Sequence, residues 1–181
     1  MTDVANATVP ATMPMQDYQL AGSGTDFLAE MQALFAQSKL LDVFDAQSVD
    51  ILAEFMQVYR MPKGGLLLRE GECSDFTILL LDGEVNVLRS HAGRAPQSIA
   101  VITPGKLIGE MSLIDREPRF ATCVAQSDVI FAVLTRTALL DLLEDHPKLG
   151  SQLLMRLVAL VSNRLRQTSA RLVALMSQSA S

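Results

Sequence analysis

The chain has 181 residues, of which 49% are hydrophobic and 19% are charged, and its formal net charge at pH 7 is −5. This length and composition suit one folded domain with appendages, and the apolar runs are far too short to cross a bilayer, so we expect a soluble protein without membrane insertion. Because nucleic-acid binding draws on clustered basic side chains, the acidic balance argues against DNA or RNA as a partner.

The amino-terminal third is predicted to contain an arm and two helices. Residues 1–24 are rich in Thr, Ala, Met and Pro without a sustained period, which favours a flexible arm. They lack a basic segment followed by an apolar core, so no secretory signal is predicted and we expect a cytoplasmic protein. Across residues 25–57 apolar side chains recur at helical spacing, and Asp45 is placed to cap the second helix.

Residues 58–136 change to short apolar runs punctuated by glycine, which is typical of strands joined by tight turns. Leu79–Leu81 precede Asp82-Gly83, and Val85 and Val87 then alternate with polar residues. This order predicts a hairpin with one solvated face. A polar loop is expected at residues 90–97.

The segment from residue 104 to 122 gathers the features of a small-anion cradle. Arg119 offers a planar guanidinium that stays charged, and Gly109 lets backbone approach a ligand closely. Residues 111–114 are predicted to form one helical turn whose free N–H groups face an anion. Glu110 begins that turn, where the helix dipole favours a carboxylate that can accept from a sugar hydroxyl. Spacing alone leaves an alternative open, in which Glu110 and Arg119 form a surface ion pair.

Two more strands are predicted on either side of residues 126–128, followed by helices over residues 137–176 and a tail at 177–181. Thr135 can cap the first helix, and Pro147 suits the first turn of the next, a helix of about eight turns. Thr168 fills a gap in the coiled-coil seam of this helix. Its hydroxyl either faces a ligand or bonds to a carbonyl of the preceding turn. The apolar seam positions are Leu154, Leu157, Val161, Leu165, Leu172 and Leu175.

The chain offers little for metal binding or catalysis. Cys73 and Cys123 form no spaced ligand pattern, and neither His91 nor His146 lies near them in sequence. We predict no metal site, and two free thiols that are buried or partly buried. No nucleophile–base pair or triphosphate loop is evident, so the chain is predicted not to be an enzyme.

Two blocks of the chain resemble the cyclic nucleotide-binding domain family, which includes the catabolite activator protein and the regulatory subunit of cAMP-dependent protein kinase. Gly-Glu-Met-Ser-Leu-Ile at 109–114 and, three residues on, Pro-Arg-Phe-Ala-Thr at 118–122 are similar to its phosphate-binding cassette. The glycine-bearing segments from Pro62 to Val85 resemble the front half of its β-roll. The resemblance implies an α+β fold, with an antiparallel, jelly-roll-like β-roll flanked by N-terminal helices and a long C-terminal helix.

The same resemblance implies the roles of the site residues. Glu110 would hold the ribose 2′-hydroxyl and Arg119 the cyclic phosphate. Residues 164–172 are similar to the dimer helix of the catabolite activator protein, where a Thr-Ser pair caps adenine from both subunits, and no DNA-reading helix-turn-helix is expected after it. The implied ligand-binding set is Gly109, Glu110, Met111, Ser112, Arg119, Phe120, Ala121, Arg164, Thr168 and Ser169.

Phe120 departs from the family pattern, which has a small or hydroxylated residue after the arginine. A phenyl ring cannot donate to phosphate, and it either narrows the pocket or stacks on a base. The Thr-Ser pair favours cAMP as the ligand, and cGMP, another nucleotide or an empty degenerate site stay open. We predict a stand-alone cyclic nucleotide receptor, homodimeric through its C-terminal helix, that signals to an unidentified effector protein by a ligand-dependent conformational change. The alternative is a dimeric interaction scaffold with a degenerate ligand site.

Overall fold

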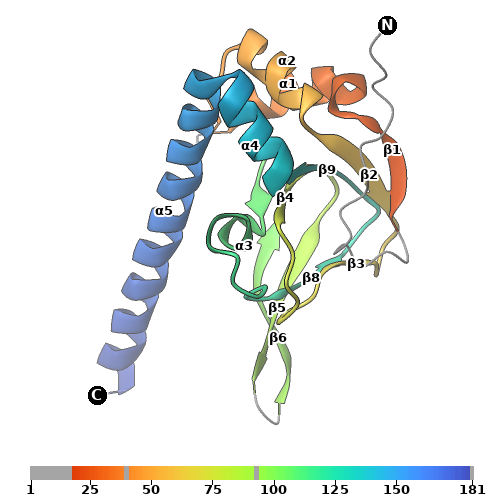
Figure 1. Cartoon of the computed structure of the whole chain (residues 1–181). Helices are drawn as coiled ribbons and strands as arrows, with labels where there is room; N and C mark the ends of the chain where they lie inside the picture. Colours follow the sequence, from red (N-terminus) through yellow and green to blue (C-terminus); the bar gives the residue numbers. More distant parts are fainter. Residues whose placement is uncertain (1–17, 39–40, 92–93, 180–181) are drawn as a thin grey trace, which may run out of the picture.

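The structure is a computed structural model that describes residues 18–38, 41–91 and 94–179. The predicted α+β fold is confirmed: two antiparallel sheets form a roll, and helices cover one end of it and extend along one side (Figure 1). The helical elements are η1 (Gly24–Phe27), α1 (Leu28–Gln37), α2 (Ala46–Glu54), α3 (Glu110–Asp115), α4 (Arg136–Asp145) and α5 (Pro147–Ser179). The strands are β1 (Gln19–Ser23), β2 (Gln57–Met61), β3 (Leu66–Leu68), β4 (Phe76–Asp82), β5 (Val85–His91), β6 (Arg94–Ile102), β7 (Leu107–Ile108), β8 (Thr122–Ala125) and β9 (Val129–Thr135).

The first described residues correct the prediction of an arm that extends to residue 24. β1 pairs antiparallel with β2 at the edge of the five-stranded sheet. Just before it, the ring of Tyr18 packs edge-on against Phe131 and Tyr59, with centroid distances of 5.5 and 6.1 Å. These partners are distant in sequence, so no local periodicity marks the strand. Residues 1–17 of the predicted arm lie outside the described residues.

Helix boundaries follow the local signals in the sequence. Oδ1 of Asp45 accepts from the backbone N–H of Ser48 at 2.8 Å and caps α2. The hydroxyl oxygen of Thr135 accepts from the N–H of Ala138 at 3.1 Å and caps α4. Pro147 is the first residue of α5. Each cap satisfies an N–H group that the helix itself leaves unpaired.

The predicted hairpin between β4 and β5 is wrong. β4 lies between β9 and β7 in a sheet of order β1-β2-β9-β4-β7, whereas β5 lies between β8 and β6 in a sheet of order β3-β8-β5-β6. Gly83, with a φ of 83°, turns the chain from one sheet to the other, and a Cβ there would collide with the carbonyl oxygen of Asp128. Nor is one face of β4 solvated. Leu79 and Leu81 pack with the helices, while the other face fills the inside of the roll: Phe76, Ile78 and Leu80.

The loop predicted at residues 90–97 is also corrected, because most of it is strand. β5 runs to His91 and β6 begins at Arg94, and the two strands pair with registers such as Arg89 opposite Gln97. Ladder hydrogen bonds join backbone groups whatever the side chains are, so polar composition did not reveal this extension.

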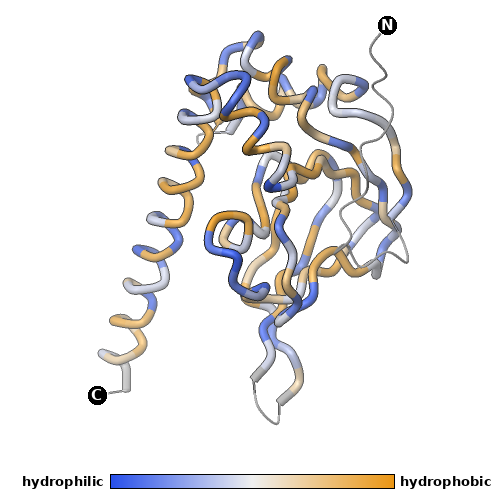
Figure 2. Tube along the Cα trace, viewed as in Figure 1, coloured by the Kyte–Doolittle hydropathy of each residue, from blue (hydrophilic) through white to orange (hydrophobic). Residues whose placement is uncertain are grey.

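The long helix α5 is packed along its first half only. Leu149, Leu153 and Leu157 are buried against the body of the protein. Farther along, Leu165 and Leu172 are 67% and 58% exposed, and Figure 2 shows apolar residues interspersed with hydrophilic ones along this half. The helix ends at Ser179, so residues 177–179 of the predicted tail are helical. Among the described residues, no helix is both long and apolar enough to span a membrane.

Candidate functional site

The turn into α3 depends on a glycine that also positions an arginine. Gly109 has a φ of 80°, in the left-handed region that favours glycine. A Cβ at this position would collide with Nη1 of Arg119. The Gly109 carbonyl oxygen instead accepts a hydrogen bond from Nη1 at 2.7 Å. One residue therefore sets both the start of the helix and the position of the guanidinium.

Arg119 is a buried cation whose side-chain partners are all neutral. The residue is 3% exposed. Besides Gly109, Nε donates to Oγ of Ser74 at 2.5 Å, Nη2 donates to the carbonyl oxygen of Phe76 at 2.7 Å, and the guanidinium carbon lies 4.6 Å from the centroid of the Phe76 ring. Burial lowers the pKa of Arg119 to about 10, so the group stays charged at neutral pH. Within the described part of the chain Arg119 has no carboxylate in an ion pair, and an anion in the adjoining space would stabilise it.

The loop between β3 and β4 holds the backbone of Arg119. The backbone N–H of Arg119 donates to the carbonyl oxygen of Glu72 at 2.9 Å. The backbone N–H of Gly71 donates to the carbonyl oxygen of Arg119, also at 2.9 Å. Cys73 in this loop is exposed, which corrects the prediction of a buried or partly buried thiol: its neighbour Ser74 takes the inward position at Nε. Cys123 is buried as predicted, and burial raises its pKa to about 12.

Glu110 is fully buried, with 0% exposure, in the first turn of α3. Its Oε1 accepts from Nη1 of Arg164 on α5 at 2.5 Å. Nη2 of Arg164 donates to the carbonyl oxygen of Leu107 at 2.7 Å. Oε2 of Glu110 is buried and has no hydrogen-bond partner among the described residues. The alternative of a surface ion pair between Glu110 and Arg119 is therefore wrong, and Glu110 retains an acceptor for an added donor.

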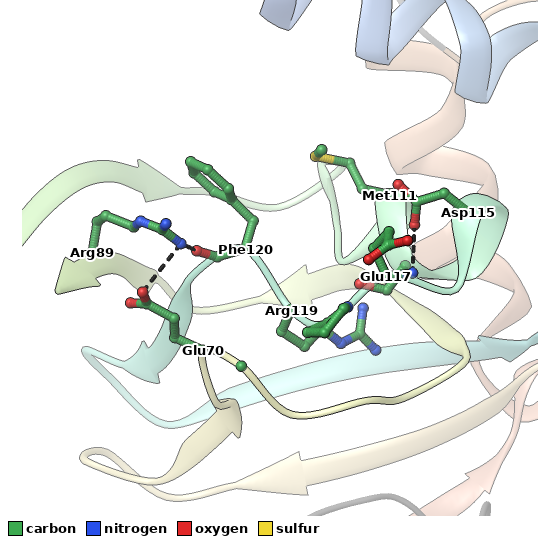
Figure 3. A pocket seen from close by; sticks show the side chains of 10 residues that line it. Glu70, Arg89, Met111, Asp115, Glu117, Arg119 and Phe120 are labelled. Atoms are coloured by element: carbon green, nitrogen blue, oxygen red, sulfur yellow. Dashed lines mark hydrogen bonds and ion pairs between the residues drawn. The ribbon is translucent and has the colours of Figure 1, made fainter.

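A hollow of about 470 Å³ opens beside Arg119 (Figure 3). Of the predicted site residues, four line it: Met111, Ser112, Arg119 and Phe120. Gly109, Glu110 and Ala121 are not among its lining residues, and Ala121 is buried. Phe120 does not fill the hollow. It is 54% exposed and stands at the outer wall (Figure 3).

Thr168 and Ser169 lie on the exposed half of α5 and do not line the hollow. The hydroxyl of Thr168 donates to the carbonyl oxygen of Arg164 at 2.9 Å, which is the bond to the preceding turn. Contact of the two residues with a ligand stays a prediction that involves a second copy of the helix.

Comparisons with known proteins identify the family. Residues 58–146 match the family model of the cyclic nucleotide-binding domain. The crystal structure of a cyclic nucleotide-binding domain from Methylobacillus flagellatus KT is 39% identical, with a TM-score of 0.78, over 87% of this chain and 88% of that chain. The chain belongs to the cyclic nucleotide-binding domain family.

Longer members of the family match over part of their length. The cyclic AMP receptor protein of Thermus thermophilus is 31% identical over 70% of this chain and 56% of its own length. The crystal structure of the Thermus thermophilus catabolite activator protein is 31% identical, with a TM-score of 0.69, over 77% of this chain and 63% of that chain. The chain thus covers 56% and 63% of the length of the first two curated relatives, which is less than two thirds of each.

This cyclic nucleotide-binding domain has a second guanidinium at the hollow, which the sequence predictions missed. Arg89 of β5 lines the hollow, donates to the carbonyl oxygen of Phe120, and pairs with Glu70 at 3.1 Å. Side chains alternate along a strand, so Arg89 shares a face with Val85 and Val87, which pack inside the roll. The sequence did contain a signal for this residue: an arginine follows two inward-facing valines at the same alternating spacing.

Arg136 at the start of α4 was also missed. Its Nη1 donates to the carbonyl oxygens of Leu113 and Ile114 near the end of α3, at 2.6 and 3.3 Å. The cassette helix of this domain is therefore bonded to α4 at one end and, through Arg164, to α5 at the other.

Proposed function

We propose that this chain is a cytoplasmic cyclic nucleotide receptor that binds cAMP and signals to a protein partner rather than to nucleic acid. The observation that carries the proposal is the buried Oε2 of Glu110, which has no partner among the described residues, one residue from the glycine that holds Arg119. A cyclic nucleotide has one negative charge for the guanidinium and a ribose hydroxyl that can donate to this oxygen.

The guanidinium has capacity for such a ligand. Arg119 has five N–H donors, of which three are engaged by Ser74, Gly109 and Phe76, so two remain for phosphate oxygens. A buried hydrogen bond to a charged group contributes about 1.5–3 kcal/mol. Arg119 and Glu110 together thus supply a substantial share of the roughly 8 kcal/mol that micromolar binding requires.

The signal would pass through Arg164. Because this residue of α5 already occupies Oε1 of Glu110, a ribose hydroxyl at the same carboxylate changes the bonding that holds the long helix. A ligand that prefers one placement of α5 shifts the population toward it. The exposed half of α5 is then the surface presented to a second copy and to an effector.

We also propose that α5 forms a homodimer. Leu165, Leu172 and Leu175 of its exposed half are 67%, 58% and 61% exposed, and they lie on the seam predicted from spacing. Pairing with the same helix of another copy would bury them and bring Thr168 and Ser169 near the partner's ligand.

Calorimetric titration tests the receptor function. We expect micromolar binding of cAMP to the wild-type chain, with cGMP titrated in parallel. Arg119→Ala should lose this binding, and Glu110→Gln should weaken it about tenfold or more. Absence of binding to both nucleotides at concentrations well above micromolar would leave the scaffold with a degenerate site as the better account.

A further inference from the structure

The outer wall of the hollow has an aromatic ring with a cation placed on one face. The guanidinium carbon of Arg89 lies 4.2 Å from the centroid of the Phe120 ring. Both residues line the hollow, and Phe120 is 54% exposed. Figure 3 shows the ring standing at the mouth of the hollow, on the opposite side of Arg119 from α3. The ring is thus accessible to a ligand whose phosphate reaches Arg119.

Arg89 is held in this position by bonds on two sides. Its guanidinium pairs with Oε1 of Glu70 at 3.1 Å and donates to the carbonyl oxygen of Phe120. Oε2 of Glu70 in turn accepts from the backbone N–H of Ser90 at 2.9 Å. Because the cation is fixed, the ring against it is oriented before a ligand arrives, and little side-chain freedom is lost on binding.

Met111 provides the facing wall. It also lines the hollow and is 42% exposed in the first turn of α3. Figure 3 shows the Met111 side chain and the Phe120 ring standing apart, both above Arg119 in this view. A flat heteroaromatic group suits a space between a phenyl ring and a polarisable thioether.

We propose that Phe120, oriented by Arg89, is the platform on which the nucleotide base stacks, and that it makes the site prefer purine over pyrimidine cyclic nucleotides. The inference rests on the proposed function and names its specificity-determining residue. A purine offers a larger π face to the ring than a pyrimidine does. Adenine and guanine offer the same bicyclic π face, so the platform does not choose between these two bases.

Affinities for cAMP, cGMP and cyclic CMP, measured on the wild-type chain and four variants, test the proposal. Phe120→Leu keeps apolar volume without a π face, and we expect it to weaken cAMP and cGMP about tenfold and cyclic CMP by less. Phe120→Tyr restores the ring and should retain the purine preference. Arg89→Met should lower the preference, because the ring is no longer fixed. Arg60→Met, at an exposed position on β2, is the matched control and should bind like the wild type.

Proton NMR of the bound nucleotide adds a readout that an indirect effect would not move. The base protons should shift upfield from the ring current of Phe120, and this shift should vanish in Phe120→Leu and persist in Phe120→Tyr. If Phe120→Leu bound the nucleotides as tightly as the wild-type chain, with an unchanged ratio of purine to pyrimidine affinity, this inference alone would be overturned. A wild-type chain that binds none of the three nucleotides would overturn the proposed function, and the inference with it.

Discussion

Nη1 of Arg164 lies 2.5 Å from Oε1 of Glu110, so the long helix α5 is bonded to the carboxylate that begins the cassette helix α3. Glu110 is fully buried, whereas the side chain of Arg164 is 38% exposed. With Arg136 of α4 bonded to the carbonyls of Leu113 and Ile114 near the end of α3, a short helix beside the hollow is connected to both C-terminal helices. A change at the hollow thereby has a bonded route to α5.

Removal of the Arg164 guanidinium should destabilise the fold. In Arg164→Met the Glu110 carboxylate stays buried without its cation, and we expect the free energy of unfolding to fall by about 1–3 kcal/mol. Chemical denaturation measures the change. Adding Glu110→Gln to Arg164→Met should recover part of the loss, because the uncompensated charge is gone. Strictly additive losses would show that the two side chains are not coupled.

Gly109→Ala should impair the site more than a comparable change elsewhere. Gly64 has a similar φ of 85°, and a Cβ there meets nothing within 4 Å, so Gly64→Ala reports the backbone cost of about 1 kcal/mol alone. At Gly109 the same cost is joined by a collision with Arg119. We expect lower stability than in Gly64→Ala, and loss of nucleotide binding only at Gly109. Equal effects in thermal unfolding and calorimetry would contradict the role of Gly109.

The two cysteines should differ in reactivity. Burial disfavours the thiolate of Cys123 and raises its pKa to about 12, so this thiol stays protonated at pH 8.5. Cys73 is exposed. Iodoacetamide should therefore label Cys73 in the native chain and reach Cys123 only after denaturation, as read by peptide mass spectrometry. If the folded Cys73→Ser variant still took up one label, Cys123 would be reactive in the native chain and the prediction would be refuted.

A charge on the exposed half of α5 should disrupt self-association. Leu172→Glu places a carboxylate in the proposed seam, where burial against another helix would be unfavourable, and the chain should sediment as a monomer. Leu140→Glu, at an exposed apolar position on α4, is the control and should leave the association state unchanged. A wild-type chain that sediments as a monomer at high concentration would rule out the helical dimer.

The sequence by itself determined the features that depend on residues a few positions apart. Asp45 and Thr135 cap the helices that follow them, and Glu110 begins a short helix after a glycine, because each interaction closes within one turn. The resemblance of residues 109–122 to a known cassette added the family and the predicted roles of Glu110 and Arg119. Both residues are buried, and their roles toward a ligand stay a prediction.

Only the tertiary structure decided which distant residues meet. Arg164 and Glu110 are 54 positions apart, and Arg89 and Phe120 are 31 apart, so no local pattern could pair them. The chain changes sheets at Gly83, and the strand at Gln19–Ser23 forms on a distant partner, because ladder hydrogen bonds and burial on both faces of β4 are set by packing. Local chemistry needs only near neighbours, whereas sheet order and the walls of the hollow arise when the whole chain is folded.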